Sequence, residues 1–551
     1  MQAKVPANWC TYVTGMLKSR LPLVVLAGFV GLFLIVGWLS LSTGDFGTNH
    51  DDGIYAVTAR SLAETGEYRI SSLPGEPYQR KYPIVFPAML AAVWRIAGDF
   101  PANIVWLKGV SLLAGAVFLI FTFGLLRTVG ASAWTATGIT GVCAVMPATG
   151  YAANSVMSEL TYGAISMGAL WVLERAIHEN PSLGLDLVAG LVAGLAYQTR
   201  TVGLALVLTM IVAMAWRRRW RSLAGGFLGV GFAVGVCRLW QGPVSEVPLV
   251  YDYYVNYGGW FLHTAHDIGW RYPVVVPLKN LVLCAVSVVG TTWPETYSFI
   301  GSVPKKFVVV GATALIVAFG VSTALLWSML IPGWIRRRHE AWAIYLLLYF
   351  AIILVWPWPP LERFIVPVLP LILLAIQEGF QRIPPSPRLL CVTATIASVI
   401  VVVSAIAGGY FRLTNVQVQP SLHRYEWILN NTAPGDVIAC MLDPNCYLYT
   451  GRKAVSIAII SDWAPFYGSQ RRPHLSAEKL AEMVRTSNAA YVMVEPMRNN
   501  IQAALAREAL ENLQRDSPGQ LEEVWYNESE EATIYRVREV KSVKGTPLSL
   551  R

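Results

Sequence analysis

Two adjacent carboxylates, Asp51 and Asp52, follow the first long apolar stretch and are the residues best suited to chemistry. A carboxylate with a suitable pKa can act as a general base, and a pair could also hold a divalent cation such as Mg²⁺ or Mn²⁺ at a phosphate. One acid is enough to cap a helix beginning here, so Asp52 could serve that role instead. We predict that both acids belong to a catalytic site, with Asp51 as the base and Asp52 as its neighbour.

Two cations, Arg80 and Lys81, follow in the same predicted outer loop, residues 44–102. Such residues are ordinarily interfacial anchors, whose apolar stems lie along lipid while their charged ends reach water. Basic pairs are disfavoured on the outer face of a membrane, and binding of an anionic group would explain this one. We therefore predict that Arg80 and Lys81 bind a substrate that carries phosphate.

Three more charged residues, Glu159, Arg200 and Arg363, stand at the outer ends of predicted membrane spans. Glu159 could cap its helix and Arg363 could pair with the adjacent Glu362. However, ionisable groups at the edge of the hydrocarbon region are costly and commonly functional. Their shared placement predicts that all three belong to the same substrate-binding site.

The composition predicts a membrane protein that crosses the bilayer many times. Of 551 residues, 54% are hydrophobic and 14% are charged, which is too apolar for a soluble protein of this length. The net charge of +9 comes from Lys and Arg that cluster in short loops beside apolar runs. This is the topology signal of membrane proteins, so nucleic acid is excluded as a partner.

The apolar runs predict about eleven spans, within a range of 10 to 13, and a cytoplasmic N-terminus. Two decisions rest on the bias of basic loops towards the cytoplasm: the run 184–216 is split at Arg200, and the run 273–292 is read as a surface or re-entrant segment. The predicted spans are 21–43, 103–126, 132–150, 158–177, 184–199, 201–216, 222–240, 306–331, 341–358, 363–380 and 389–408.

The chain is expected to contain two parts: a mainly helical membrane domain, residues 1–408, and an extracytoplasmic α/β domain, residues 409–551. No residue of the second part suggests a catalytic role. Its predicted strands are 437–441, 454–460 and 489–495, its helices are 422–430, 476–485 and 501–513, and 521–526 with 532–538 forms a hairpin. Cys440 and Cys446 could form a disulfide in an oxidising compartment or remain thiols.

The outer loop 241–272 is rich in aromatic residues, which indicates an aromatic belt at the level of the lipid headgroups. A groove for carbohydrate is the alternative, because aromatic rings also stack on sugars. His263 and His266 could share a helical face as metal ligands, but no third ligand is evident.

Taken in order, these motifs resemble the membrane glycosyltransferases of the GT-C fold, above all the protein O-mannosyltransferase and aminoarabinose lipid A transferase group. The resemblance covers about residues 45–375. It is carried by Asp51-Asp52-x-x-Tyr55, Lys81-Tyr82-Pro83, Ser158-Glu159, Arg200-Thr201, and Arg363-Phe364 followed by Pro367 and Pro370.

The resemblance implies a sugar donor linked to polyprenyl phosphate, an acceptor bound from the outer side, and inversion at the anomeric carbon. It implies that Asp51 is catalytic, that Tyr55 belongs to the substrate site, and that Lys81 and Arg363 bind the lipid phosphate. Some relatives carry an acid immediately before this lysine, where this chain has Arg80, which puts a metal site built on that position in doubt.

The expected protein is therefore a glycosyltransferase of a bacterial inner membrane, acting on a glycan, lipid or protein acceptor. No phosphate-binding glycine loop suggests use of a nucleotide. A transporter or lipid flippase is the main rival, in which the same charges would line a path through the membrane. A scaffold whose C-terminal domain is the working part is a third interpretation.

Overall fold

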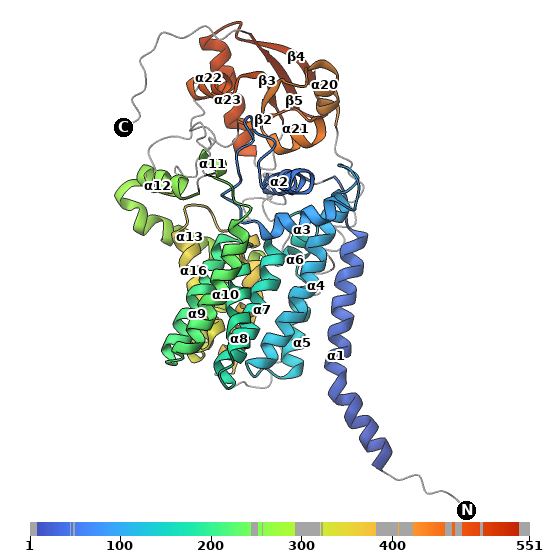
Figure 1. Cartoon of the computed structure of the whole chain (residues 1–551), viewed down its shortest axis with the longest axis vertical. Helices are drawn as coiled ribbons and strands as arrows, with labels where there is room; N and C mark the ends of the chain where they lie inside the picture. Colours follow the sequence, from blue (N-terminus) through green and yellow to red (C-terminus); the bar gives the residue numbers. More distant parts are fainter. Residues whose placement is uncertain are drawn as a thin grey trace, which may run out of the picture.

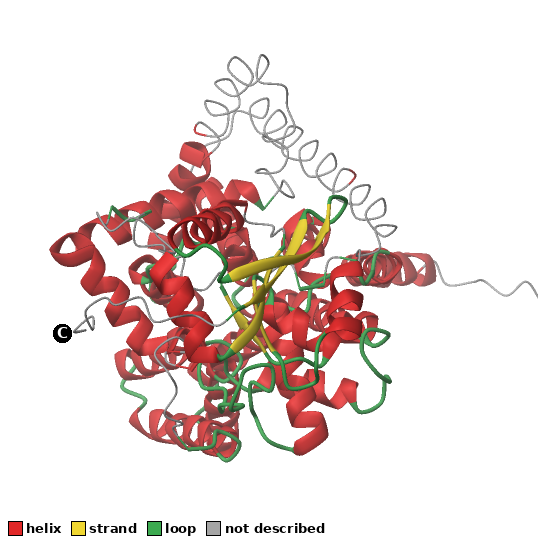
Figure 2. Cartoon of the chain, turned by 90° about the horizontal axis from the view of Figure 1, so that it is seen from above, coloured by secondary structure: helices red, strands yellow, loops and turns green. Residues whose placement is uncertain are grey.

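The computed structural model shows a bundle of helices with a small α/β domain covering one end (Figure 1). Seen along the bundle, the strands lie over the middle of the helices (Figure 2). The structure describes residues 8–44, 46–47, 50–243, 252–255, 257–291, 320, 323–381, 406, 422–457, 466–468, 477–495 and 500–538.

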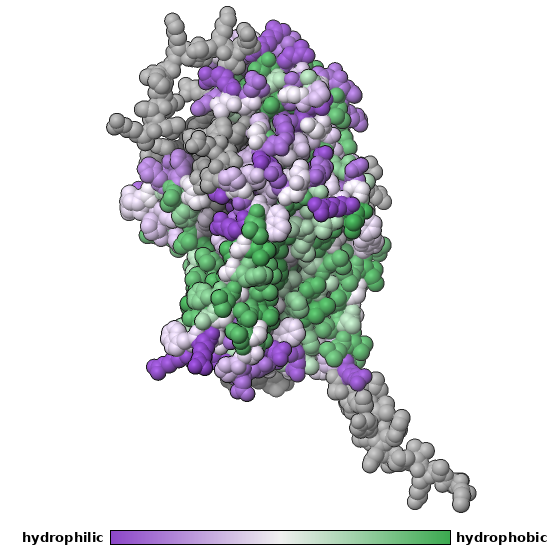
Figure 3. All heavy atoms as spheres, viewed as in Figure 1, coloured by the Kyte–Doolittle hydropathy of each residue, from purple (hydrophilic) through white to green (hydrophobic). Residues whose placement is uncertain are grey.

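An apolar belt surrounds the bundle, with hydrophilic side chains at both ends, as Figure 3 shows. Within the described part of the chain, five helices are long and apolar enough to cross a membrane: Arg20–Leu39, Ile104–Thr128, Trp220–Arg238, Gly258–Gly290 and Glu362–Phe380. Together these features make the chain an integral membrane protein.

The bundle is built from α1 (Asn8–Leu39), α4 (Ile104–Thr128), α5 (Ala133–Val145), α6 (Pro147–Ala153), α7 (Glu159–His178), α8 (Leu183–Tyr197), α9 (Leu204–Trp216), α10 (Trp220–Arg238), α13 (Tyr272–Gly290), α16 (Ala341–Val355) and α18 (Leu369–Phe380). The mainly helical class is confirmed, whereas the count of about eleven spans is not. Most of the predicted span 306–331 and nearly all of 389–408 lie outside the described residues.

Two breaks interrupt the predicted runs. The expected break at Arg200 is confirmed, because α8 ends at Tyr197 and a 3₁₀ turn, η1 (Thr201–Gly203), precedes α9. The run 132–150 is not one helix, which corrects the prediction. Met146 is extended and Pro147 begins α6, as expected of a proline, which lacks an N–H and disfavours helical geometry in the residue before it.

Helix α13, in the run 273–292, lies along the end of the bundle that carries α2. The Tyr272 hydroxyl, at the start of α13, donates to the carbonyl of Val355, where α16 ends. Past the other end of α13, the carbonyl of Thr291 accepts from the N–H of Ala148 in α6. Although its length and composition would permit a crossing, both ends of α13 therefore contact helix ends on the same side of the bundle.

Two short helices lie between the bundle and the α/β domain (Figure 1): α2 (Asp51–Thr65) and α3 (Val85–Trp94). Helix α2 confirms the helix expected after the acidic pair. It is buried along most of its length, with Ile54, Tyr55 and Val57 in its core face. The outer loop also contains α11 (Asp252–Val255), α12 (Tyr257–Ile268) and η3 (Gly269–Arg271). A helix covered on both faces is a firm platform for side chains at its start.

The C-terminal part is an α/β unit with a mixed sheet in the order β2-β1-β3-β5-β4, and the predicted strands, helices and hairpin are all present. β1 is parallel to β2 and β3, whereas β5 is antiparallel to β3 and β4. The elements are α20 (His423–Asn431), β1 (Val437–Cys440), α21 (Asp443–Thr450), β2 (Ala454–Ser456), α22 (Ala477–Ser487), β3 (Ala489–Val494), α23 (Asn500–Asp516), β4 (Leu521–Asn527) and β5 (Ala532–Val537). Only α21 was not expected.

Helices α8 and α10 approach so closely that their glycines cannot carry side chains. A Cβ on Gly190 would lie 1.9 Å from the carbonyl oxygen of Gly226, and one on Gly229 would lie 2.2 Å from that of Leu187. Small residues at such positions let two membrane helices pack backbone to backbone. By contrast, a Cβ on Gly231, two residues further along α10, would meet no atom within 4 Å.

The substitution Gly229→Ala is expected to lower the thermal unfolding temperature of the detergent-solubilised protein, because the two backbones must separate. The matched variant Gly231→Ala should leave it unchanged or raise it slightly, since alanine favours a helix by about 0.8–1 kcal/mol over glycine. Equal unfolding temperatures for the two variants would contradict the close packing.

Candidate active site

Asp51, the first residue of α2, is held through both carboxylate oxygens. The Tyr82 hydroxyl donates to Oδ1 at 2.6 Å, and the Arg363 guanidinium donates through Nη1 to Oδ2 at 3.1 Å. Arg363 stands on the short helix α17 (Glu362–Ile365), which leads through the turn η4 (Val366–Val368) into α18. The ion pair joins residues 312 positions apart in the sequence and is only partly exposed.

Glu159 lies between two arginines at the start of α7. Its Oε1 is 2.8 Å from Nη1 of Arg200 and 3.9 Å from Nε of Arg363. The carboxylate is buried, with 1% of the residue exposed. A buried acid flanked by two guanidinium groups holds apart cations that would otherwise repel each other.

Tyr55 and Ser158 close the cluster on the side away from Arg363. Arg200 donates from Nη1 to the Ser158 hydroxyl at 3.1 Å, and that hydroxyl lies 3.0 Å from the Tyr55 hydroxyl. The Tyr55 ring packs edge-on against Tyr82, with centroids 5.1 Å apart. We call Asp51, Tyr55, Tyr82, Ser158, Glu159, Arg200 and Arg363 the site cluster.

Lys81 is buried beside this cluster, and 4% of the residue is exposed. Its Nζ lies 5.0 Å from the centroid of the Tyr82 ring, and its charge acts on Asp51. Burial lowers the pKa of Lys81 to about 7; the negative charge of Asp51 opposes this and the charge of Arg363 adds to it. Lys81 can therefore gain or lose its proton near neutral pH.

The pKa of Asp51 is lowered below its ordinary value. Burial alone would raise it, but the charges of Arg363 and Lys81, with the hydrogen bond from Tyr82, together outweigh burial. Asp51 is therefore ionised at neutral pH.

Asp52 does different work from its neighbour. Its two oxygens accept the backbone N–H groups of Gly47 and Gly53, both at 2.9 Å, so the carboxylate fixes the turn before α2. Burial raises the pKa of Asp52 to about 6, although the two backbone donors oppose the shift. The geometry favours the structural role considered for this acid, while its predicted catalytic role remains a prediction.

Lys108, in α4, is a buried cation that sequence reasoning missed. Its Nζ donates to the carbonyl of Ser42 at 2.7 Å, and its charge acts on Asp52. A lysine inside an apolar helix was the available signal, because such residues rarely occur without a partner or a function. Lys108 thus supports the turn in which both acids lie.

Arg80 is not joined to the site cluster by a contact. It donates from Nη2 to the carbonyl of Gly242 at 3.0 Å and so ties the first outer loop to the segment after α10. Its predicted role in substrate binding remains a prediction.

The acidic pair is not arranged as a joint cation site. Asp51 is engaged by a tyrosine and an arginine, and Asp52 by two backbone amides. In the part of the chain that the structure describes, no three His, Cys, Asp or Glu side chains gather to hold a metal. The residues present do not fit a divalent cation, and we assign no step to one.

The aromatic outer loop packs against the chain after α16. Trp260 and Phe261 of α12 lie with ring centroids 5.6 and 5.3 Å from that of Trp356, which accounts for these two rings by packing. His263, considered above as a metal ligand, lies 3.4 Å from Asp267 in the same helix. In the C-terminal domain, Cys440 and Cys446 are both buried free thiols.

The fold is that of the GT-C glycosyltransferases. No family model matches the sequence, and no curated relative matches it. Crystal structures do match: ArnT from Cupriavidus metallidurans bound to undecaprenyl phosphate superposes with a TM-score of 0.52, at 14% identity over 92% of this chain and 97% of that chain. The Archaeoglobus fulgidus oligosaccharyltransferase in its apo form has a TM-score of 0.55, at 12% identity over 97% and 76%.

A further structure of the archaeal enzyme, in complex with an inhibitory peptide and a dolichol-phosphate, has a TM-score of 0.52, at 12% identity over 97% of this chain and 75% of that chain. The expected GT-C fold is thus confirmed. At such identities the likeness concerns the fold alone.

The substitution Glu159→Gln is expected to destabilise the protein by about 3–5 kcal/mol, because two buried guanidinium groups lose the carboxylate between them. Removing one cation as well, in Glu159→Gln with Arg200→Gln, should recover part of this loss. Thermal unfolding in detergent measures both effects. As a control, Glu64→Gln, which breaks the exposed pair with Arg60, should cost under about 1 kcal/mol; a similar small cost for Glu159→Gln would refute the prediction.

Proposed function

We propose that this protein transfers a sugar from a polyprenyl-phosphate-linked donor to an acceptor, with inversion, on the extracytoplasmic side of a bacterial inner membrane. The observation that carries the proposal is the site cluster. An ionised acid, Asp51, shares one end of the bundle with the cations Lys81, Arg200 and Arg363. The GT-C fold supports it, as does undecaprenyl phosphate bound to the structurally similar ArnT.

In the proposed reaction the bond between the anomeric carbon and the phosphate oxygen breaks, and its electron pair leaves with the phosphate. The leaving group thereby gains one negative charge. Lys81, Arg200 and Arg363 stabilise that charge, and their fixed positions avoid reorganisation during the reaction. An oxygen of the acceptor forms the new bond from the opposite face, which inverts the anomeric carbon.

Asp51 takes the proton from the acceptor hydroxyl. A carboxylate paired with arginine is a weak base, but a donor phosphate competes for the same cations. When Arg363 and Lys81 turn to the phosphate, the two charges that lower the pKa of Asp51 are drawn away. Donor binding therefore makes Asp51 a stronger base when the acceptor is in place.

Asp51→Asn is expected to reduce sugar transfer by about 10²–10⁴-fold, because the amide cannot accept a proton. The test uses purified protein, a panel of radiolabelled undecaprenyl-phosphate sugars, and envelope glycans, lipids and proteins as acceptors. Asp52→Asn keeps an oxygen that can accept one backbone N–H, so its transfer rate should fall less. Wild-type protein that binds undecaprenyl phosphate but transfers no sugar would instead support a flippase.

Binding of undecaprenyl phosphate should weaken about tenfold per pH unit above pH 7, because Lys81 loses its charge as the pH rises through its lowered pKa of about 7. Below that, affinity should rise between pH 5 and 7 as the phosphate loses its second proton near pH 6. Lys81→Met should abolish the falling limb. Arg80→Gln should retain it, since a guanidinium does not titrate in this range; a falling limb that survives in Lys81→Met would contradict this role.

A further inference from the structure

The start of helix α21, in the C-terminal domain, reaches the turn that carries Asp51. Asp443 is fully buried, and its Oδ1 lies 2.9 Å from Nε2 of His50, the residue immediately before Asp51. Sequence reasoning found no functional residue in this domain. The contact joins positions 393 residues apart, so no local pattern could have indicated it.

Backbone packing brings the same two segments together. A Cβ on Gly47 would lie 1.8 Å from Nδ2 of Asn445, and one on Gly53 would lie 2.7 Å from Cβ of Pro444. Gly47 also has a φ of +85°, a conformation that other residues rarely adopt. The turn before α2 and the first turn of α21 therefore fit each other without room for a side chain.

His50 itself has a conformation that needs support. Its φ is +59° and its ψ is −48°, an unfavourable geometry for a residue with a Cβ, and no side chain caps the helix that follows. Such a conformation persists where its surroundings hold it. Asp443 holds the His50 ring, and the ring of Tyr254 lies 6.2 Å away, centroid to centroid.

The charges around His50 favour the same contact. Burial would lower the pKa of His50, but the hydrogen bond and negative charge of Asp443 outweigh it, so the pKa is raised. Asp51 acts in the same direction as Asp443, whereas Lys81 opposes them. The protonated ring therefore pairs with Asp443.

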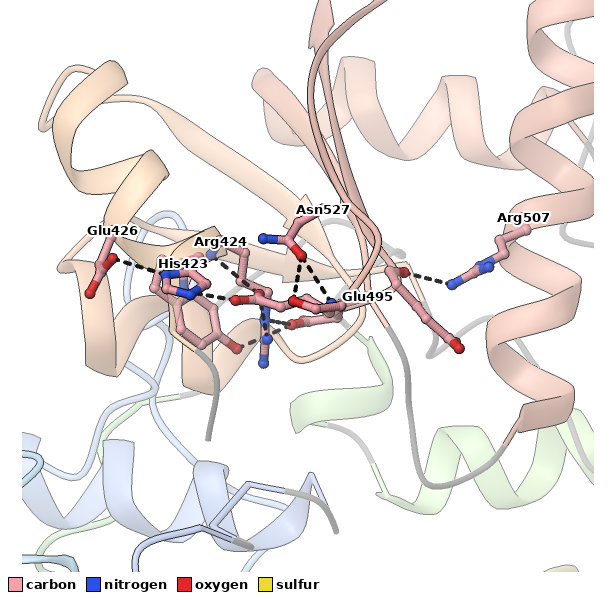
Figure 4. Close-up of polar contacts among 10 residues, drawn as sticks. His423, Arg424, Glu426, Glu495, Arg507 and Asn527 are labelled. Atoms are coloured by element: carbon pink, nitrogen blue, oxygen red, sulfur yellow. Dashed lines mark hydrogen bonds and ion pairs between the residues drawn. The ribbon is translucent and has the colours of Figure 1, made fainter. Parts of the chain in front are cut away.

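The C-terminal domain fixes the position of Asp443 from behind. Glu495, fully buried at the end of β3, accepts the N–H of Leu442 at 3.0 Å, immediately before α21. Arg424 donates to Glu495 from Nε at 2.7 Å and to Glu530 from Nη1 at 3.0 Å, within the network that Figure 4 shows. A chain of buried ionic contacts thus links the core of the domain to the turn beside Asp51.

We propose that Asp443 is a positioning residue of the transferase site: through His50 it aims Asp51, so the site is completed by the C-terminal domain. This inference rests on the proposed function for its catalytic consequence. The positioning itself concerns the turn 44–53 and can be measured without any substrate.

The test compares Asp443→Ala, His50→Ala and the double variant in the full-length protein. Hydrogen exchange in the peptide 44–66 should be at least about tenfold faster in each single variant. Transfer should fall about 10–100-fold, as expected when a catalytic group is misplaced, while binding of undecaprenyl phosphate is retained. Because Asp443 acts through His50, the double variant should be no worse than the more affected single variant.

The control is Glu76→Gln, which breaks another contact between the first outer loop and the C-terminal domain, the 2.6 Å ion pair with Lys453. Exchange in 44–66 and transfer should match the wild type. If Asp443→Ala does not fold, Asp443→Asn, which keeps the size and one acceptor oxygen, should show a smaller change in the same direction.

Exchange in 44–66 equal to the wild type in the folded Asp443 variant, or effects of the two single variants that multiply, would overturn the inference. Failure of the proposed function is distinct, because wild-type protein would then neither bind undecaprenyl phosphate nor transfer sugar. The exchange measurement would still decide whether Asp443 holds the turn.

Discussion

The ion pair between Asp51 and Arg363 is the contact on which the rest of the site depends. It joins the start of α2 to α17, and through Arg363 it reaches Glu159 at the start of α7. Three separate parts of the bundle are therefore fixed relative to one another by charge. Partly buried ion pairs of this kind require exact partners, because an unpaired charge there is costly. Stability and a concentrated electrostatic field thus come from the same residues.

Membrane topology made much of this site predictable. Charged residues at the ends of apolar runs must lie in two layers, one at each face of the bilayer, and basic loops indicate which layer is cytoplasmic. This placed Asp51, Glu159, Arg200 and Arg363 in one layer, where the structure brings them together. The alternating patterns of the C-terminal strands were equally informative, because one residue in two faces a buried layer.

The remainder depended on directions and distances that a sequence does not carry. Arg80 and Lys81 are adjacent, yet one bonds the segment after α10 and the other lies beside Tyr82. Outside a helix, neighbouring side chains commonly point to different sides. Asp51 and Asp52 are distinguished only by their partners, a guanidinium in one case and two amides in the other. His50 and Asp443 met no rule, because their contact exists only in the folded chain.

The long separation between His50 and Asp443 also has a consequence for biosynthesis. Ribosomes add about 5–20 residues per second, so roughly 20–80 seconds pass between synthesis of one partner and of the other. Until then the first outer loop is exported without the residue that supports it. Nascent chains still held by the insertion machinery consequently lack a finished centre, and incomplete translation products remain inert in the bilayer.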